Sequence, residues 1–163
     1  MSNLGEWNKD LSNAKLVAHT NNRPLIVFAG SSRTCHWCKI ADEKVFSQDG
    51  WKKYAATKGI PQYYADESFA ATRKIRRAIS SEYKMGLWPT VLIFKIKDTA
   101  DFSTTSLDGK GNAELIGMFL YRNNAFYTLG GKKLKIAQPT PESFERLIES
   151  FYSSSHPEWT KDL

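Results

Sequence analysis

The chain has 163 residues, of which 41% are hydrophobic and 25% are charged, so the composition excludes a disordered chain and indicates a single domain over residues 1–163 with a hydrophobic core. Two cysteines are too few for a disulfide framework, and the longest apolar runs are too short to cross a bilayer. We therefore expect no membrane span. The net charge of +6 would suit binding to nucleic acid, but no recognised nucleic-acid motif accompanies it, so we expect no nucleic-acid partner.

The first third of the chain is predicted to hold a helix, a buried strand and further helices. Five apolar residues recur at steps of three and four: Leu4, Trp7, Leu11, Ala14 and Ala18. This stripe predicts an N-terminal helix that ends near residues 21–24. The run over residues 25–29 is continuously apolar, as expected of a central strand covered on both faces. Beyond it, one helical face is predicted to follow the cysteines through Ile40 and Phe46, and a short helix to occupy residues 51–58.

A strand, a basic helix and a second central strand follow. Residues 62–65 form the strand, and Ser68 is placed to cap a helix that runs to Tyr83. The apolar positions of this helix are Phe69, Ile75, Ile79 and Tyr83. The basic run over residues 73–77 is therefore interpreted as the solvated face of the helix. Residues 90–97 are rich in β-branched and aromatic side chains, which predicts the second central strand.

The region after that strand is predicted to add a β edge. Residues 98–112 are polar and turn-rich, and residues 113–121 are a strand candidate. Residues 123–131 are interpreted as a loop or a hairpin that elaborates one edge of the sheet. Leu134 and Ile136 alternate with lysines, which predicts a last strand.

The final helix is predicted to begin at Thr140 and Pro141, with threonine as its cap and proline as its first residue. Its apolar stripe is Phe144, Leu147, Ile148 and Phe151. The order of helices and strands along the whole chain predicts an α/β layered domain, parallel in its first half and antiparallel in its second.

The only cysteines, Cys35 and Cys38, form a Cys-x-x-Cys motif after the predicted strand and at the start of a predicted helix. Thiols at this spacing can close a small disulfide, and the unpaired N–H groups of a helix start favour the thiolate of the first cysteine. Cys35 is the candidate nucleophile and Cys38 the candidate resolving thiol. A purely structural disulfide is the alternative. No recognisable ligand spacing supports zinc, so we expect neither a metal nor a bound cofactor.

Two motifs stand out: residues 35–38 follow an apolar strand, and Trp88-Pro89-Thr90 precedes a later strand. In both, the chain resembles the thioredoxin superfamily, and within it the group whose redox motif reads Cys-His-Trp-Cys. The resemblance implies a thioredoxin fold: a central mixed β-sheet flanked by helices, here with an N-terminal helix and an elaborated C-terminal β edge. It also implies a cis-proline at Pro89, with Trp88, Pro89 and Thr90 beside the substrate. The chain departs from thioredoxin at residues 28–30, which hold no buried aspartate.

The two residues between the cysteines are candidates for tuning the thiolate and for contacting substrate. His36 can stabilise the Cys35 thiolate by charge or by a hydrogen bond, which predicts a reduction potential above that of thioredoxin; the alternative is a solvated histidine without influence. Trp37 is either an exposed apolar contact for substrates or a lid packed over the local surface.

We therefore expect a thiol–disulfide oxidoreductase that exchanges disulfides with protein or peptide substrates through Cys35 and Cys38 and is recycled by a redox partner. The alternative is a redox-inert, thioredoxin-like scaffold that binds a partner protein. A monomer is expected. The first eleven residues do not read as a secretory leader, which favours the cytoplasm; a periplasmic or secreted protein whose leader has been removed is the alternative.

Overall fold

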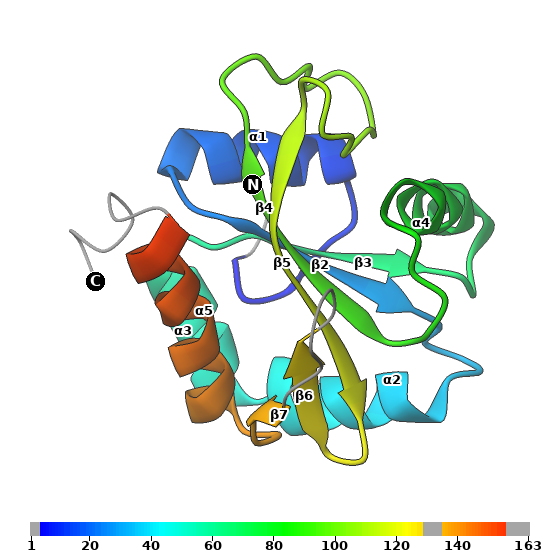
Figure 1. Ribbon diagram of the computed structural model, residues 1–163, viewed down its shortest axis with the longest axis vertical. Coiled ribbons are helices and arrows are strands. Elements are labelled where there is room, and N and C mark those ends of the chain that lie inside the picture. The colour runs from blue at the N-terminus through cyan, green and yellow to red at the C-terminus, as the bar shows by residue number, and fades with distance from the viewer. Residues whose placement is uncertain (1–3, 129–134, 156–163) are drawn as a thin grey trace.

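The computed structural model describes residues 4–128 and 135–155, and a mixed β-sheet runs through its centre (Figure 1). Within these residues the strands are β1 (Trp7–Asn8), β2 (Leu25–Gly30), β3 (Gln62–Asp66), β4 (Thr90–Ile96), β5 (Ala113–Arg122), β6 (Ala125–Thr128) and β7 (Lys135–Ala137), in the spatial order β1-β3-β2-β4-β5-β6-β7. The pairings β1–β3 and β3–β2 are parallel, and every pairing from β2–β4 onwards is antiparallel. The predicted parallel first half and antiparallel second half are confirmed.

Helices cover both faces of the sheet (Figure 1). They are α1 (Leu11–Asn21), α2 (His36–Ala41), the π-helical turn η1 (Asp42–Phe46), α3 (Asp49–Lys58), α4 (Ala70–Tyr83) and α5 (Pro141–Ser155). One face packs against α2, η1, α3 and α5, and the other packs against α1, α4 and the loop 98–112. None of the helices in the described part of the chain is long and apolar enough to span a membrane.

The continuous apolar run of β2 is explained by the two cores. Ile26 and Phe28 are fully buried in the core beneath α2, whereas Leu25, Val27 and Ala29 are fully buried in the core beneath α1 and α4. Successive side chains of a strand point to opposite faces, so a strand covered on both sides needs no polar alternation. Burying each of the larger side chains stabilises the fold by about 1.5–3 kcal/mol.

The N-terminal helix begins later than its stripe predicts. Asp10 caps α1 by accepting a hydrogen bond from the Asn13 amide at 3.3 Å, so the helix starts at Leu11. Trp7 lies instead in β1, paired with Gln62, and its ring contacts Phe28 at 5.6 Å. The prediction that Leu4 and Trp7 belong to the helix is wrong, because Trp7 packs partly buried against the core from an edge strand and not from a helical face.

The predicted cap of α4 is also wrong. The N-cap residue of α4 is Phe69, and no side chain caps the helix there. The Ser68 hydroxyl is engaged elsewhere, because it accepts a hydrogen bond from the Arg33 amide at 3.0 Å and lies 2.7 Å from the Ser31 hydroxyl. Phe69 is not part of the buried face, since its side chain is 44% exposed beneath the Arg33 guanidinium.

The C-terminal elements agree with their predictions where the structure describes them. Asn123 and Asn124 both have positive φ and join β5 to β6 in a two-residue turn, so the hairpin alternative holds as far as residue 128. The Thr140 hydroxyl accepts a hydrogen bond from the Ser143 amide at 3.2 Å, as expected of the cap of α5. Residues 129–131, Leu134, and the side chains of Ile136 and Phe151 lie outside the described part.

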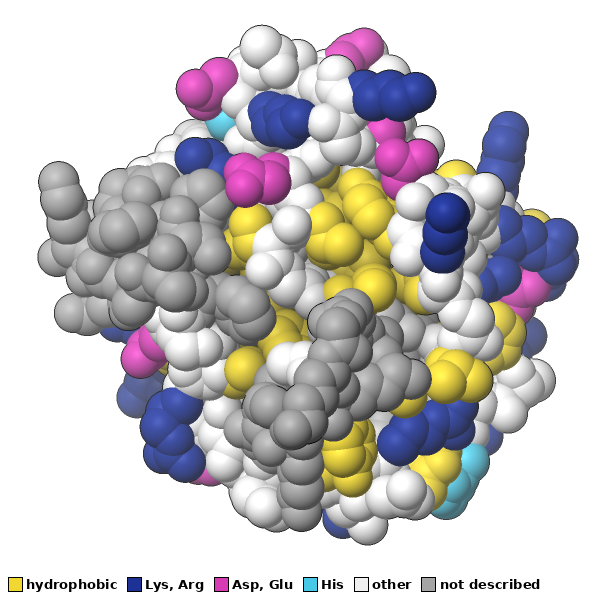
Figure 2. All heavy atoms as spheres, viewed as in Figure 1, with side chains coloured by type: hydrophobic (Ala, Val, Ile, Leu, Met, Phe, Trp, Pro, Cys, Tyr) yellow, Lys and Arg dark blue, Asp and Glu magenta, His cyan; other side chains and the backbone are white. Residues whose placement is uncertain are grey.

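The loop 98–112 is held by a buried lysine that the sequence did not single out. The Lys15 side chain is 0% exposed, and its ammonium donates to the Asp101 carbonyl at 2.9 Å, the Ser106 carbonyl at 3.0 Å and the Thr104 hydroxyl at 3.3 Å. Burial lowers the pKa of Lys15, although Asp101 and Asp108 act in the opposite direction. A groove of about 590 Å³ runs between this loop and α4, and Figure 2 shows hydrophobic side chains gathered there.

Replacing Lys15→Met should lower the free energy of unfolding by about 1–3 kcal/mol, because the acceptors on the loop 98–112 lose their donor. Urea unfolding followed by circular dichroism measures this loss. The matched control is Lys9→Met, which removes the same charge from an exposed position. Equal stability of the two variants would contradict the anchoring role of Lys15.

Candidate active site

The two cysteines lie where β2 gives way to α2. Cys35 is the N-cap residue of α2, Cys38 is in the first turn of the helix, and the two are joined by a disulfide with their Cα atoms 5.2 Å apart. The Cys38 amide donates to the Cys35 sulfur at 3.2 Å. Cys35 is half-buried whereas Cys38 is fully buried, so the sulfur of Cys35 is the one nearer to solvent.

Cys38 is packed against the last residue of β2. A Cβ atom added to Gly30 would lie 2.5 Å from the Cys38 sulfur, so no larger residue fits at this position without displacing the disulfide. The Ser31 amide donates to the same sulfur at 3.4 Å. The neighbouring side chain from β2 is that of Phe28, so the buried side of the disulfide faces an apolar core.

A single carboxylate holds the loop that precedes the disulfide. Asp66 ends β3, beside Gly30 in the register of the parallel pair, and is 6% exposed. Its oxygens accept hydrogen bonds from the Ser32 amide at 3.0 Å, the Ser32 hydroxyl at 2.5 Å and the Ser68 amide at 2.9 Å. Sequence reasoning missed Asp66. The available signal was its place at the carboxyl end of a strand predicted to lie parallel to β2, since such ends meet at one edge of a sheet.

The loop before β4 faces the disulfide across an open cleft. The peptide bond between Trp88 and Pro89 is cis, and the Thr90 hydroxyl donates to the Leu87 carbonyl at 2.7 Å. The cleft has a volume of about 510 Å³ and is lined by Cys35, His36, Trp37, Gly86, Leu87, Trp88 and Arg122. The fold therefore brings four of the predicted site residues to one cleft, whereas Cys38, Pro89 and Thr90 are buried behind it.

The residues between the cysteines differ in their exposure. His36 is exposed, and its ring centroid lies 5.0 Å from that of Trp37. Trp37 is half-buried and also contacts the ring of Tyr121 at 6.2 Å, so it combines an apolar contact surface with packing over the sheet. Arg122 completes this side of the cleft and was missed, because nothing in the sequence connects the end of β5 with the cysteines.

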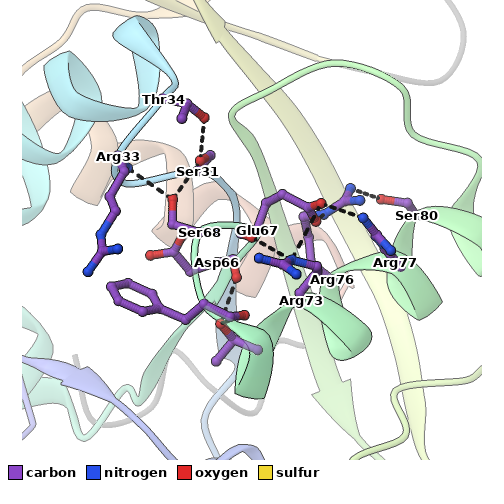
Figure 3. Close-up of polar contacts among 12 residues, drawn as sticks. Ser31, Arg33, Thr34, Asp66, Glu67, Ser68, Arg73, Arg76, Arg77 and Ser80 are labelled. Atoms are coloured by element: carbon purple, nitrogen blue, oxygen red, sulfur yellow. Dashed lines mark hydrogen bonds and ion pairs between the residues drawn. The ribbon is translucent and has the colours of Figure 1, made fainter.

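The basic run of α4 is not a uniformly solvated face. The Arg76 side chain is only 11% exposed and bonds the Glu67 carboxylate at 2.6 Å, and Arg77 bonds it at 2.9 Å (Figure 3). The guanidinium of Arg76 also lies 4.9 Å from the centre of the Trp88 ring. The prediction of a solvated face is wrong for Arg76, because Glu67 and Trp88 draw its side chain towards the cleft.

Among the described residues, no three His, Cys, Asp or Glu side chains gather into a group able to hold a metal ion.

No protein-family model matches the chain, and no curated protein sequence matches it. Two solved structures are similar in fold. One is described as a DsbH oxidoreductase, with a TM-score of 0.57 and 13% identity over 94% of this chain and 87% of that chain. The other is the solution structure of a thioredoxin from Thermus thermophilus, with a TM-score of 0.53 and 13% identity over 95% of this chain and 91% of that chain. The chain therefore has a thioredoxin-like fold, which confirms the predicted fold class.

Replacing Gly30→Ala should destabilise the oxidised protein by about 1–3 kcal/mol, because the added methyl group overlaps the Cys38 sulfur. Chemical unfolding of the disulfide form measures the loss. Gly111→Ala is the matched control, since a Cβ atom there meets nothing within 4 Å. If Gly30→Ala were as stable as the control, the close packing of Cys38 on β2 would be refuted.

Proposed function

We propose that the protein is a thiol–disulfide oxidoreductase that exchanges disulfides with protein or peptide substrates through Cys35 and Cys38. The observation that carries this proposal is the asymmetry of the pair: two bonded sulfurs at a helix start, one beside an open cleft and the other buried behind it. The thioredoxin-like fold supports the proposal, because the two similar structures are described as an oxidoreductase and a thioredoxin.

The reaction proceeds in two exchanges. In the reduced protein the Cys35 thiolate attacks a substrate disulfide, forms a mixed disulfide and releases one substrate sulfur as a thiolate that takes up a proton. Cys38 then loses its proton and attacks the Cys35 sulfur, which closes the intramolecular disulfide and releases the second substrate sulfur as a thiolate that takes up a proton. Two electrons pass from the protein to the substrate. Run in reverse, the same steps place a disulfide in a substrate.

The surroundings of Cys35 favour its role as the attacking thiolate. The Cys38 amide points at its sulfur, so a donor is already in place for the negative charge. Arg33 and Lys39 are close in sequence and add positive charge around the helix start. Cys38 lacks this exposure, and it reaches a substrate only through the mixed disulfide on Cys35.

The cleft supplies the substrate contacts in this proposal. Trp37 and Trp88 line it together with Cys35, so their rings would contact the chain that carries the substrate cysteine. Pro89 and Thr90 are buried, and they would act by shaping the loop on which Trp88 stands. The direction of exchange follows from the potential of the couple and from the redox partner that recycles it.

Exchange is tested by replacing the two cysteines separately. Cys38→Ser should accumulate a mixed disulfide with a substrate, because nothing displaces the captured sulfur, whereas Cys35→Ser should capture none. Turnover of a model disulfide should fall to the rate without protein in both variants. Non-reducing electrophoresis and mass spectrometry detect the adduct.

The redox-inert scaffold gives the opposite result. In that case the disulfide fails to equilibrate with glutathione, and neither replacement changes the turnover of a model disulfide. Binding of a partner protein would then persist in both cysteine variants.

His36→Ala should lower the reduction potential of the couple by about 20 mV, because the Cys35 thiolate loses stabilisation worth about one hydrogen bond. For this two-electron couple, about 30 mV corresponds to ~1.4 kcal/mol. Equilibration with glutathione measures the potential. His19→Ala is the control, because that ring lies beside Phe102 and Asp98 and away from the disulfide. An unchanged reduction potential in His36→Ala would show that the His36 ring does not stabilise the Cys35 thiolate.

A further inference from the structure

A second pocket adjoins the residue before Cys35. It has a volume of about 300 Å³, and its walls are formed by Ser31, Arg33, Thr34, Glu67, Ser68, Arg73 and Arg77. Ser31, Arg33 and Thr34 belong to the loop that leads into the disulfide, and the others belong to the corner between β3 and α4 and to α4 itself. Because Thr34 directly precedes Cys35 in the chain, the pocket belongs to the same loop that ends at the disulfide.

The walls of this pocket are tied together by hydrogen bonds (Figure 3). The Ser31 hydroxyl lies 2.6 Å from the Thr34 hydroxyl and 2.7 Å from the Ser68 hydroxyl. The Arg33 amide donates to the Ser68 hydroxyl at 3.0 Å, and Asp66 holds Ser32 and Ser68 from below. The pocket is thus a fixed part of the loop structure that also carries the disulfide.

The charges in the walls favour an anion. The walls carry three arginines and one carboxylate, that of Glu67, so positive charge is in excess. Arg77 bonds Glu67 at 2.9 Å but keeps 64% of its side chain exposed, and Arg73 lies 3.9 Å from the same carboxylate with 42% exposed. In the described part of the chain the Arg33 guanidinium pairs with no carboxylate and stacks on Phe69 at 4.5 Å.

The contacts of Glu67 show that Arg77, and more distantly Arg73, accept a carboxylate. Although desolvation opposes ionisation, the hydrogen bonds from Arg76 and Arg77 keep the pKa of Glu67 below its usual range, so the carboxylate is ionised at neutral pH. The planar guanidinium fork matches the two oxygens of a carboxylate. A carboxylate of a substrate would meet the exposed parts of Arg73 and Arg77, which line the pocket.

We propose that this pocket is a subsite for a carboxylate of the substrate, an Asp or Glu side chain next to the cysteine that bonds to Cys35. The inference rests on the proposed exchange at Cys35 and adds a preference to it. Substrates with an acidic residue beside the reactive cysteine are captured faster than neutral or basic ones, and the preference weakens as salt screens the arginines.

The test uses one exchange step in the Cys38→Ser protein. Matched peptides carry a single cysteine as a 2-thiopyridyl disulfide, with Glu, Gln or Lys beside it. The Cys35 thiolate attacks the peptide sulfur, the peptide becomes bonded to Cys35, and pyridine-2-thione leaves and is followed by its absorbance. At low salt the Glu peptide should react about fivefold faster than the Gln peptide, the effect expected of one partly exposed ion pair, and the Lys peptide should be slowest.

Three variants assign the preference to this pocket. In the Cys38→Ser background, Arg77→Gln should reduce the Glu-to-Gln rate ratio towards one, and Glu67→Gln should raise it because the competing carboxylate is removed. The control is Lys74→Gln, which removes the same charge from the same helix. Lys74 lines the groove between α4 and the loop 98–112 and not this pocket, so the variant should keep the wild-type ratio. Using the ratio cancels any common effect on the reactivity of Cys35.

Three outcomes overturn the proposal: a wild-type ratio of one at low salt, an equal loss of the ratio in Lys74→Gln and Arg77→Gln, or no effect of salt on the ratio. A Cys35 that reacts with none of the peptides would contradict the proposed exchange itself. Equal, rapid reaction with all three peptides would contradict the carboxylate subsite alone.

Discussion

The parallel pairing of β2 with β3 is the constraint on which the candidate site depends. It sets Gly30 beside Asp66, so one strand ends against the disulfide while its neighbour ends in a buried carboxylate. That carboxylate accepts hydrogen bonds from the loops after both strands. The position of Cys35 is therefore determined by two chain segments that lie far apart in the sequence. The pocket lined by Arg33, Arg73 and Arg77 is built from the same two segments.

The apolar side of the disulfide follows from the residue content of β2. Phe28 packs against Trp7, Phe46 and Tyr64 with ring centroids 4.8–5.6 Å apart, so aromatic packing fills the region below Cys38. Removing a charge from water into such surroundings is costly unless it is paired. Both sulfurs receive a backbone amide, Cys35 from Cys38 and Cys38 from Ser31, so the partial exposure of Cys35 makes it the better place for the negative charge of the reduced pair.

Local rules predicted the elements whose cause is local. The apolar run of β2, the cysteine motif at a helix start and the Thr140–Pro141 cap all follow from neighbouring residues, and the structure has them where the sequence indicates. The errors arise where a distant contact decides. Trp7 has helical spacing but packs, partly buried, against the core beneath η1, and Ser68 suits a cap but bonds the loop before Cys35. The sequence predicts that the Arg76 side chain is solvated, but the fold places Glu67 and Trp88 beside it.

The anchoring of the loop 98–112 by Lys15 has a consequence for chemical modification. Acylating reagents and acetylating enzymes need an accessible, unprotonated amine, and this amine is enclosed by the acceptors of the loop. Its reaction requires a local opening that detaches the loop from α1, so the rate at which Lys15 becomes labelled in the native protein reports how often that opening occurs. An acyl group acquired there would remove the positive charge and leave a single N–H donor for three acceptors, so the tether of the loop would be weakened.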